Sequence, residues 1–266
     1  MWRGLYTAGI GMMTQMNRTS VISNNLANAA TSGFKRDRVV DEEFGPMLIR
    51  RINDDDPNGD ITRIKQFHVV DTIPPVVGNL GLGAQTAEIV TDLSQGSMQD
   101  TGNQLDLAIA GSGFFAVATP QGVRYTRDGS FTRAANGDIV NHRGETVLNR
   151  QGRAINIPQN ATRISVGHDG TVFADGEQMG TLQLVEFDDP RAAVKEGDNH
   201  YVARPGARPR PATGSIEQGV LEMSNANVIN EMVELIDNYR IYEANSRAVT
   251  TQDTMLDHSV NQVGRL

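Results

Sequence analysis

The sequence contains no cysteine among its 266 residues. This absence excludes disulfide bonds, thiolate zinc sites, iron–sulfur clusters and cysteine nucleophiles. Aromatic residues make up only 5% of the chain, so a core must be built from aliphatic and methionine side chains. The formal net charge of −8 argues against nucleic acid as a partner. No apolar run approaches the roughly 18 residues of a membrane-spanning helix, so membrane insertion is not expected.

Proline and glycine are nearly absent from both ends of the chain. All 10 prolines lie between Pro46 and Pro211. Of the 27 glycines, those outside residues 33–219 are Gly4, Gly9, Gly11 and Gly264. Because both residue types mark turns, this distribution predicts a turn-rich centre between two terminal helices.

Both ends carry larger apolar residues at alternating steps of three and four, the spacing of a coiled-coil stripe. The predicted assembly-interface residues are Leu5, Met12, Met16 and Leu26 in the first stripe, and Val228, Met232, Leu235, Tyr239, Tyr242, Val249, Leu256 and Val260 in the second. No glycine or proline interrupts residues 220–263, which predicts a helix of about 40 residues and roughly 60 Å. Such a helix is longer than a domain of this size, so its stripe is expected to meet other chains. An ordinary two-helix core element is the alternative.

Charge favours pairing between the two ends. Residues 1–30 contain Arg3 and Arg18 and no acidic residue, whereas residues 222–263 contain seven acidic residues and two arginines. Opposite charges favour contact between the terminal helices, although an exposed ion pair contributes only about 0–1 kcal/mol. Residues 1–28 lack the apolar core and cleavage site of a secretory signal peptide, so we expect them to belong to the mature protein.

The centre of the chain changes to short apolar runs with a period near two. The strand candidates are Leu105–Ile109, Phe114–Ala118, Arg124–Thr126, Asp138–Val140, Thr162–Val166, Thr171–Phe173 and Leu182–Phe187. Asn-Gly and Asp-Gly pairs between these runs predict hairpins. The sequence therefore predicts an α+β protein in four parts: an N-terminal helical part (1–33), an extended connector with room for one hairpin (34–84), a central all-β domain (85–214) and a long C-terminal helix (215–266). The terminal helices are expected to pair as a coiled coil.

Three motifs suggest a cofactor, metal or catalytic site, but the residues around each motif argue against that function. Gly111–Ala116 (GSGFFA) matches a dinucleotide fingerprint, but a strand-like run follows where that site needs a helix. Asp54–Ile61 matches the start of a calcium loop, but Lys65 stands where a bidentate glutamate is needed. The histidines His68, His142, His168, His200 and His258 show no metal or catalytic spacing. We therefore expect no enzyme, no cofactor and no metal site, and interpret Asp54–Asp60 as a solvated acidic turn.

Several motif blocks follow one another along nearly the whole chain. They are Val21–Asn28 (VISNNLAN), Thr31–Lys35 (TSGFK), Gln95–Ser97 (QGS), Thr101–Ile109 (TGNQLDLAI), Gly111–Phe115 (GSGFF), Tyr125–Phe131 (YTRDGSF), Gly219–Asn227 (GVLEMSNAN) and Tyr242–Asn245 (YEAN). In this order they resemble the flagellar rod and hook family, the axial proteins of the bacterial flagellar basal body. The length resembles that of a proximal- or distal-rod protein, because small rod subunits lack the central domain and hook proteins usually carry an extra outer one.

The resemblance implies a structural axial subunit that polymerises through its terminal helices, transmits torque and forms the export channel. It implies partners among copies of itself and other rod and hook subunits, transit through the type III export apparatus, and a place in the basal body of the cell envelope. The motif residues that carry it are Asn24, Asn25, Leu26, Ala27, Asn28, Gly33, Phe34, Ser224, Asn225 and Asn227. Two alternatives stay open: a hook or hook-associated axial protein, and a secreted, calcium-tuned binding module using Asp54–Asp60.

The motif residues also have local roles. Residues 23–28 compete for helical hydrogen bonds and are expected to end the first helix. Gly33 can supply a positive φ where the chain leaves that helix. Residues 224–227 offer side-chain oxygens that can cap the helix that follows them.

Overall fold

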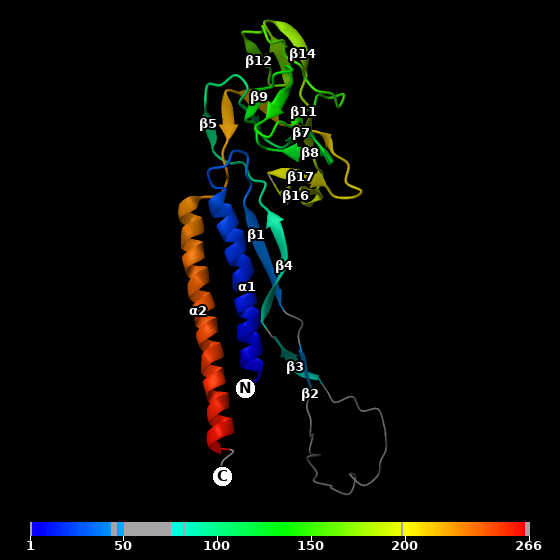
Figure 1. The fold of residues 1–266 in the computed structure, drawn as a ribbon. Helices are drawn as coiled ribbons and strands as arrows, with labels where there is room; N and C mark the ends of the chain where they lie inside the picture. The colour runs from blue at the N-terminus through cyan, green and yellow to red at the C-terminus, as the bar shows by residue number, and fades with distance from the viewer. Residues whose placement is uncertain (1, 44–46, 51–75, 82, 198, 264–266) are drawn as a thin grey trace, which may run out of the picture. The chain divides into compact units, whose positions relative to one another are not determined.

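The computed structural model describes residues 2–43, 47–50, 76–81, 83–197 and 199–263. Within these ranges the protein is α+β, with a helix near each end and a central region built mostly of strands (Figure 1). This confirms the predicted class. The chain divides into a first unit, formed by residues 1–18, 39–88 and 237–266, and a second unit, formed by residues 19–38 and 89–236. The Asp54–Asp60 turn and His68 lie outside the described residues.

The first helix, α1 (Trp2–Ala27), contains the N-terminal apolar stripe. It ends where motif asparagines offer competing hydrogen bonds, because Nδ2 of Asn28 donates to the carbonyl of Asn24 at 2.8 Å. Beyond this end, Gly33 has a φ of 65°, a left-handed conformation that glycine adopts without a steric penalty. Both features agree with the predicted end of the helix.

The second helix, α2 (Val228–His258), has 31 residues, and a π-helical turn (Ser259–Val263) follows it. At 1.5 Å per residue it is roughly 46 Å long. Asn227 caps its start, because its Oδ1 accepts hydrogen bonds from the backbone N–H groups of Ile229 and Asn230 at 3.0 and 3.2 Å.

The prediction of one helix over 220–263 is wrong at its N-terminal end. Strand β19 (Ser215–Gln218) pairs with β6 (Leu107–Ala110), and strand β20 (Val220–Glu222) pairs with β5 (Met98–Asp100), both antiparallel. These ladders satisfy the backbone groups of residues 215–222 in the β region. Tertiary pairing therefore outweighs the local freedom to form a helix, and the part predicted as helical at 215–266 starts with strands.

The largest sheet of the second unit has nine strands. Seven follow the order β16 (Ala193–Gly197), β17 (His200–Ala203), β8 (Gly122–Thr126), β7 (Phe114–Thr119), β11 (Thr146–Val147), β10 (Ile139–Asn141) and β9 (Phe131–Arg133). The other two, β15 (Leu184–Glu186) and β18 (Arg210–Pro211), pair with each other, and β15 also pairs with β7. A short 3-10 helix, η2 (Pro190–Ala192), comes directly before β16.

The remaining strands form smaller sheets. Strands β12 (Ile164–Val166), β13 (Thr171–Ala174) and β14 (Glu177–Thr181) form one sheet in the second unit. Strand β1 (Asp37–Glu43) pairs with β4 (Ala84–Thr91), and β2 (Met47–Arg50) pairs antiparallel with β3 (Val76–Leu80). The predicted extended connector therefore consists largely of paired strands in its described parts, including the one hairpin-like pair.

The seven predicted strands all correspond to observed ones, namely β6, β7, β8, β10, β12, β13 and β15. Strand β7 is buried on both faces, because Phe115 and Val117 pack in one hydrophobic cluster while Phe114 and Ala116 pack in another. Phe115 also meets Phe131 edge to face, with ring centroids 5.1 Å apart. The core of the second unit thus lies on both sides of this central strand.

The weak motifs lie in ordinary structural positions. Gly111 and Gly113 have positive φ in the turn between β6 and β7, so a strand follows where a dinucleotide site needs a helix. The histidines at 142, 168, 200 and 258 lie on separate turns, a strand and a helix end. In the described ranges no three His, Asp or Glu side chains are arranged to hold a metal ion. None of the described helices is long and apolar enough to span a membrane.

Candidate functional site

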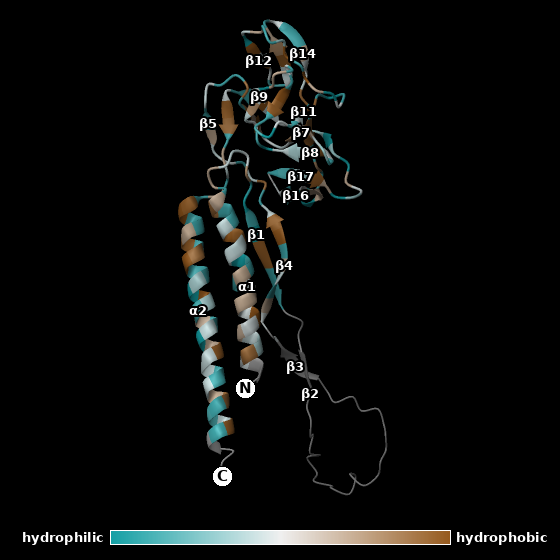
Figure 2. Cartoon of the chain, in the orientation of Figure 1, coloured by the Kyte–Doolittle hydropathy of each residue, from teal (hydrophilic) through white to brown (hydrophobic). Residues whose placement is uncertain are grey.

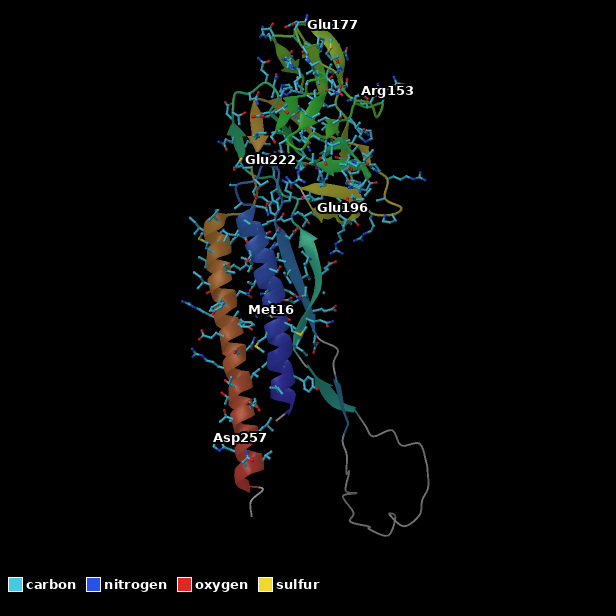
Figure 3. The ribbon with its side chains drawn as sticks, viewed as in Figure 1. Met16, Arg153, Glu177, Glu196, Glu222 and Asp257 are labelled. Carbon is cyan, nitrogen blue, oxygen red and sulfur yellow. The ribbon has the colours of Figure 1, made fainter. Side chains whose placement is uncertain are left out.

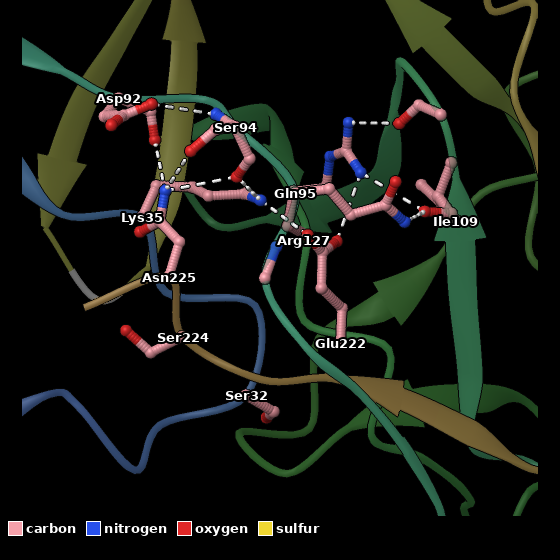
Figure 4. A network of polar contacts seen from close by, with 12 residues as sticks. Ser32, Lys35, Asp92, Ser94, Gln95, Ile109, Arg127, Glu222, Ser224 and Asn225 are labelled. Atoms are coloured by element: carbon pink, nitrogen blue, oxygen red, sulfur yellow. Dashed lines mark hydrogen bonds and ion pairs between the residues drawn. The ribbon is translucent and has the colours of Figure 1, made fainter. Parts of the chain in front are cut away.

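A buried ionic junction lies at the centre of the second unit. Lys35, Arg127 and Glu222 come from the segment after α1, the turn between β8 and β9, and strand β20 (Figure 4). Lys35 Nζ lies 2.5 Å from Glu222 Oε1, and Arg127 Nη1 lies 3.1 Å from Glu222 Oε2. The side chains of Lys35 and Glu222 are fully buried. One buried carboxylate therefore forms ion pairs with two cations.

Backbone groups supply further hydrogen bonds to these three charges, although the buried Nε of Arg127 has no hydrogen-bond partner among the described residues. Glu222 Oε1 also accepts a hydrogen bond from the backbone N–H of Gly96 at 2.9 Å. Lys35 Nζ donates to the carbonyl of Ser94 at 2.7 Å, and Arg127 Nη2 donates to the carbonyl of Gly111 at 2.8 Å. Burial lowers the pKa of Lys35, and the hydrogen bond to Glu222 opposes that shift. The carbonyl dipoles partly compensate the excess positive charge.

Asn225 ties together the backbones of two other segments at this junction. Its Oδ1 accepts a hydrogen bond from the N–H of Arg36 at 2.8 Å. Its Nδ2 donates to the carbonyls of Asp92 and Ser94 at 2.8 and 3.1 Å. Because the amide is used as acceptor and donor at once, an aspartate at this position would lose the donor half of the contacts.

Gly33 lets the chain pass close to the β region. Its N–H donates to the backbone carbonyl of Glu222 at 2.6 Å. A Cβ at this position would lie 2.4 Å from the backbone carbon of Arg127, closer than any side chain tolerates. Only glycine therefore combines the positive φ with this approach.

A second polar contact joins the end of α1 to the start of α2 within this unit. Asn25 and Glu231 are both only 2% exposed, and Nδ2 of Asn25 donates to Oε2 of Glu231 at 3.2 Å. Asn25 also bonds both backbone groups of Asp37 at 2.9 Å. Arg36 Nη1 lies 3.7 Å from Glu231 Oε1 and balances its charge. The first turn of α2 thus directs an ionised group into the protein.

The structure brings some of the predicted motif residues together and leaves others apart. Asn25, Gly33 and Asn225 line the two polar contacts, and Ser224 is buried beside Asn225. Phe34 is buried, and Lys195 Nζ lies 3.8 Å from its ring centroid. The remaining motif residues have smaller roles: Asn24 and Asn28 end α1, Asn227 caps α2, Leu26 is half-buried, and Ala27 is exposed.

Sequence reasoning missed the charged centre of the junction. Lys35, Arg127 and Glu222 each lie inside a motif block, in TSGFK, YTRDGSF and GVLEMSNAN. The usable signal was charge inside blocks otherwise made of small, apolar and turn-forming residues: Lys35 and Glu222 are the single charged residues of their blocks, and Arg127 stands next to Asp128 in its own. The blocks point to a shared site only once it is known that the three segments meet.

The predicted interface residues of α2 divide between two faces of the helix. Leu235, Tyr242, Val249 and Leu256 are half-buried. Val228, Met232 and Tyr239 are exposed, and so is Val260 in the π-helical turn that follows α2. On α1, Leu5 and Met12 are half-buried, whereas Met16 is 60% exposed (Figure 3). The stripe read from the sequence therefore combines one half-buried seam with residues that face outward.

Large apolar side chains gather on the exposed side of the first turns of α2, where the helix is most hydrophobic (Figure 2). We call this side the outer face, defined as Val228, Ile229, Met232, Val233, Ile236 and Tyr239, which are 42–72% exposed. The opposite, inner face consists of Glu231, Leu235, Asn238, Tyr242, Asn245, Val249, Gln252 and Leu256, which are buried or half-buried. Soluble monomers rarely expose so continuous an apolar surface without a partner.

Comparison with known proteins matches three segments of the chain to flagellar families. Residues 5–35 match the flagella basal body rod protein family, residues 108–174 match the flagellar hook protein FlgE/F/G D1 domain, and residues 217–263 match the flagellar basal body rod FlgEFG protein C-terminal family. Lys35, Arg127 and Glu222 fall one in each segment. The ionic junction is therefore where the three family segments meet.

Whole-length relatives agree with these segments. The flagellar basal-body rod protein FlgG of Bacillus subtilis (strain 168) is 35% identical, over 98% of this chain and 99% of the relative. FlgG of Buchnera aphidicola subsp. Schizaphis graminum is 34% identical over 95% and 96%. The rod protein FlgF of Caulobacter vibrioides is 32% identical over 98% of each chain. With relatives of this similarity along nearly its full length, the chain belongs to the family of flagellar basal-body rod proteins.

Proposed function

We propose that this chain polymerises through its terminal helices as an axial subunit of the rod, and that the polymer transmits torque and encloses the export channel. Family membership already makes it a structural protein of the flagellar basal body, because its relatives are rod proteins. The observation that carries the further step is the outer face of α2. Its partners are copies of this chain and other rod and hook subunits.

The outer face provides a driving force for assembly. Fully burying one large aliphatic side chain contributes about 1.5–3 kcal/mol. The six residues of this face are already partly covered, so burying the rest contributes on the order of 5 kcal/mol per subunit. A helical array in which every subunit makes such a contact gains this free energy at each addition. On α1, Tyr6, Met13 and Met16 are also large, exposed apolar side chains whose burial would favour assembly.

Torque transmission requires that the helices be held firmly to the folded region beside them. The buried charges of Lys35, Arg127 and Glu222 supply such a connection within the second unit. Paired, buried charges are costly to separate, because each would be left uncompensated. The absence of cysteine suits a chain that crosses the export apparatus unfolded.

The test compares two isoleucines of equal exposure. Ile236 on the outer face is 53% exposed, and Ile89 on β4 is 55% exposed. We expect Ile236→Asp to leave the monomer folded but to block assembly, because the carboxylate would be buried between subunits. Ile89→Asp is expected to assemble normally. Each variant is expressed in a strain lacking this gene, with circular dichroism of the monomer, electron microscopy of basal bodies and a motility assay as readouts. Normal rods formed by Ile236→Asp would contradict the proposal.

A further inference from the structure

The inner face of α2 carries a polar residue at every seventh position. We call Glu231, Asn238, Asn245 and Gln252 the polar ladder. Seven residues are about 20° short of two full helical turns, so these side chains lie nearly along one line. Glu231 and Asn238 are only 2% and 4% exposed. The ladder therefore occupies the seam positions that a helix pair usually fills with apolar residues.

In the first unit, the ladder amides lie against the backbone of α1. Asn238 Nδ2 donates to the carbonyl of Gln15 at 2.8 Å. A Cβ at Gly11 would lie 2.9 Å from Nδ2 of Asn245, and one at Gly4 would lie 3.2 Å from Nε2 of Gln252. Successive ladder residues thus meet successively earlier residues of α1, so the two helices run antiparallel in this unit (Figure 1).

In the second unit, Glu231 continues the ladder with an ionised group. Its carboxylate contacts Asn25 at 3.2 Å and Arg36 at 3.7 Å. On the opposite side of the same turns, Ile229, Val233 and Ile236 are exposed. These first turns of α2 therefore bury a carboxyl group beside the half-buried Leu235 and leave large apolar side chains exposed, unlike an ordinary amphipathic helix.

We infer that the polar ladder fixes the rotation of α2 about its own axis and thereby holds the outer face toward other copies of the chain. A buried amide or carboxylate is tolerated only where a partner meets it, and its burial without one costs about 1–3 kcal/mol. The glycines of α1 leave room for the amide heads, and Arg36 and Asn25 meet the carboxylate. Rotating α2 to bury its apolar side would break all of these contacts together. The inference rests on the proposed role of the outer face in assembly.

The polar ladder adds less stability than apolar residues would, but it defines the orientation of α2. Apolar residues at the same positions would pack as well or better, but they would accept several rotations of the helix. Buried polar residues that set register or orientation are known to act in this way in coiled coils. The side chains of the ladder are thus positioning residues for the assembly surface, and they do not touch the partner subunit.

Thiol labelling can measure the rotation, because the natural chain has no cysteine. Val233→Cys reports the outer face, and Leu235→Cys reports the inner face. The ladder variant carries Asn238→Leu and Asn245→Leu. The control carries Asp237→Leu and Ala244→Leu, which add two leucines to the same turns at exposed positions. Labelling rates are measured on the dilute full-length monomer, and thermal unfolding is recorded for each protein.

We expect the Val233→Cys thiol to react at least fivefold faster than the Leu235→Cys thiol in the natural background and in the control. In the ladder variant this ratio should fall at least threefold, with no decrease in the unfolding temperature. An unchanged ratio, or an equal fall in the control, would overturn the inference. A lower unfolding temperature with an unchanged ratio would show that the amides only stabilise the pair. Because the labelling uses monomers, it fails or succeeds independently of the Ile236→Asp assembly test.

Discussion

Replacing Glu222 by glutamine should destabilise the second unit far more than replacing Lys35 by methionine. Glu222→Gln removes the single carboxylate and leaves two cations, Lys35 and Arg127, in the interior. Lys35→Met removes one cation and leaves Arg127 and Glu222 as a balanced pair 3.1 Å apart. The two substitutions are similar in size and affect the same contact. The difference between their free energies of unfolding therefore reports the effect of charge balance.

The structure sets the magnitude of this asymmetry. Breaking a buried ion pair by removing one partner costs about 3–5 kcal/mol, a large part of the roughly 5–15 kcal/mol that stabilises a domain. After Lys35→Met both groups that Lys35 contacts keep another partner: Glu222 keeps the N–H of Gly96, and the carbonyl of Ser94 keeps Nδ2 of Asn225. That change should therefore cost only about 0–2 kcal/mol. We expect a difference of at least about 2 kcal/mol between the variants.

Urea unfolding of the full-length monomer measures the loss of stability in both variants. Near-ultraviolet circular dichroism follows the buried Tyr125 and Tyr201 of the second unit. With a urea dependence of about 1–3 kcal/mol per molar, the midpoints should differ by about 1 M. Equal losses in the two variants would refute the reasoning, and so would a double variant less stable than Glu222→Gln alone, because removing Lys35 should relieve the excess charge.

The pH dependence gives a second check on Lys35. Burial lowers its pKa below the ordinary value of 10.5 in the folded state. Between the lowered pKa and 10.5 the unfolded chain binds more protons than the folded chain, so stability rises with pH in that window. The natural chain should therefore gain stability relative to Lys35→Met as the pH is raised from neutral toward 10.5. Other alkaline groups, including Tyr201, are common to both proteins and cancel in the difference.

Three further predictions concern other parts of the chain. Gly11→Ala should raise the unfolding temperature less than Gly9→Ala does, because both gain helix propensity but only a Cβ at Gly11 requires the amide of Asn245 to shift. Gln218→Ala should raise aggregation in light scattering, since Gln218 covers β12 by accepting from the N–H of Val166 at 3.1 Å and donating to the carbonyl of Ile164 at 3.0 Å. Glu186→Gln should flatten the loss of stability below pH 4.5, because hydrogen bonds from the Thr213 backbone and hydroxyl lower the pKa of Glu186 and its stabilisation disappears as the pH falls.

The sequence predicted the fold class and several strands of the central region because their signals are local, whereas the two longest strands, β1 and β4, were not predicted. Residues 114–118 (FFAVA) form an unbroken apolar run between turn signals, and the observed strand β7 covers them. Strand β11 has two residues, which cannot show a period. Residues 220–222 look compatible with a helix, and only pairing with Met98–Asp100 makes them a strand. Long-range pairing of this kind leaves no mark in the local pattern.

The outer face of α2 shows why periodicity cannot identify the direction in which a helix face points. Leu235 and Met232 belong to the same predicted stripe, yet Leu235 is half-buried and Met232 is 48% exposed. Hydropathy assigns apolar residues to the inside, whereas the start of α2 places Glu231 inside. That placement is possible because Asn25 and Arg36, about 200 residues away in the chain, meet the carboxylate. On the proposed role of the outer face, the buried polar residues decide the orientation of α2, and their partners are visible only in the folded chain.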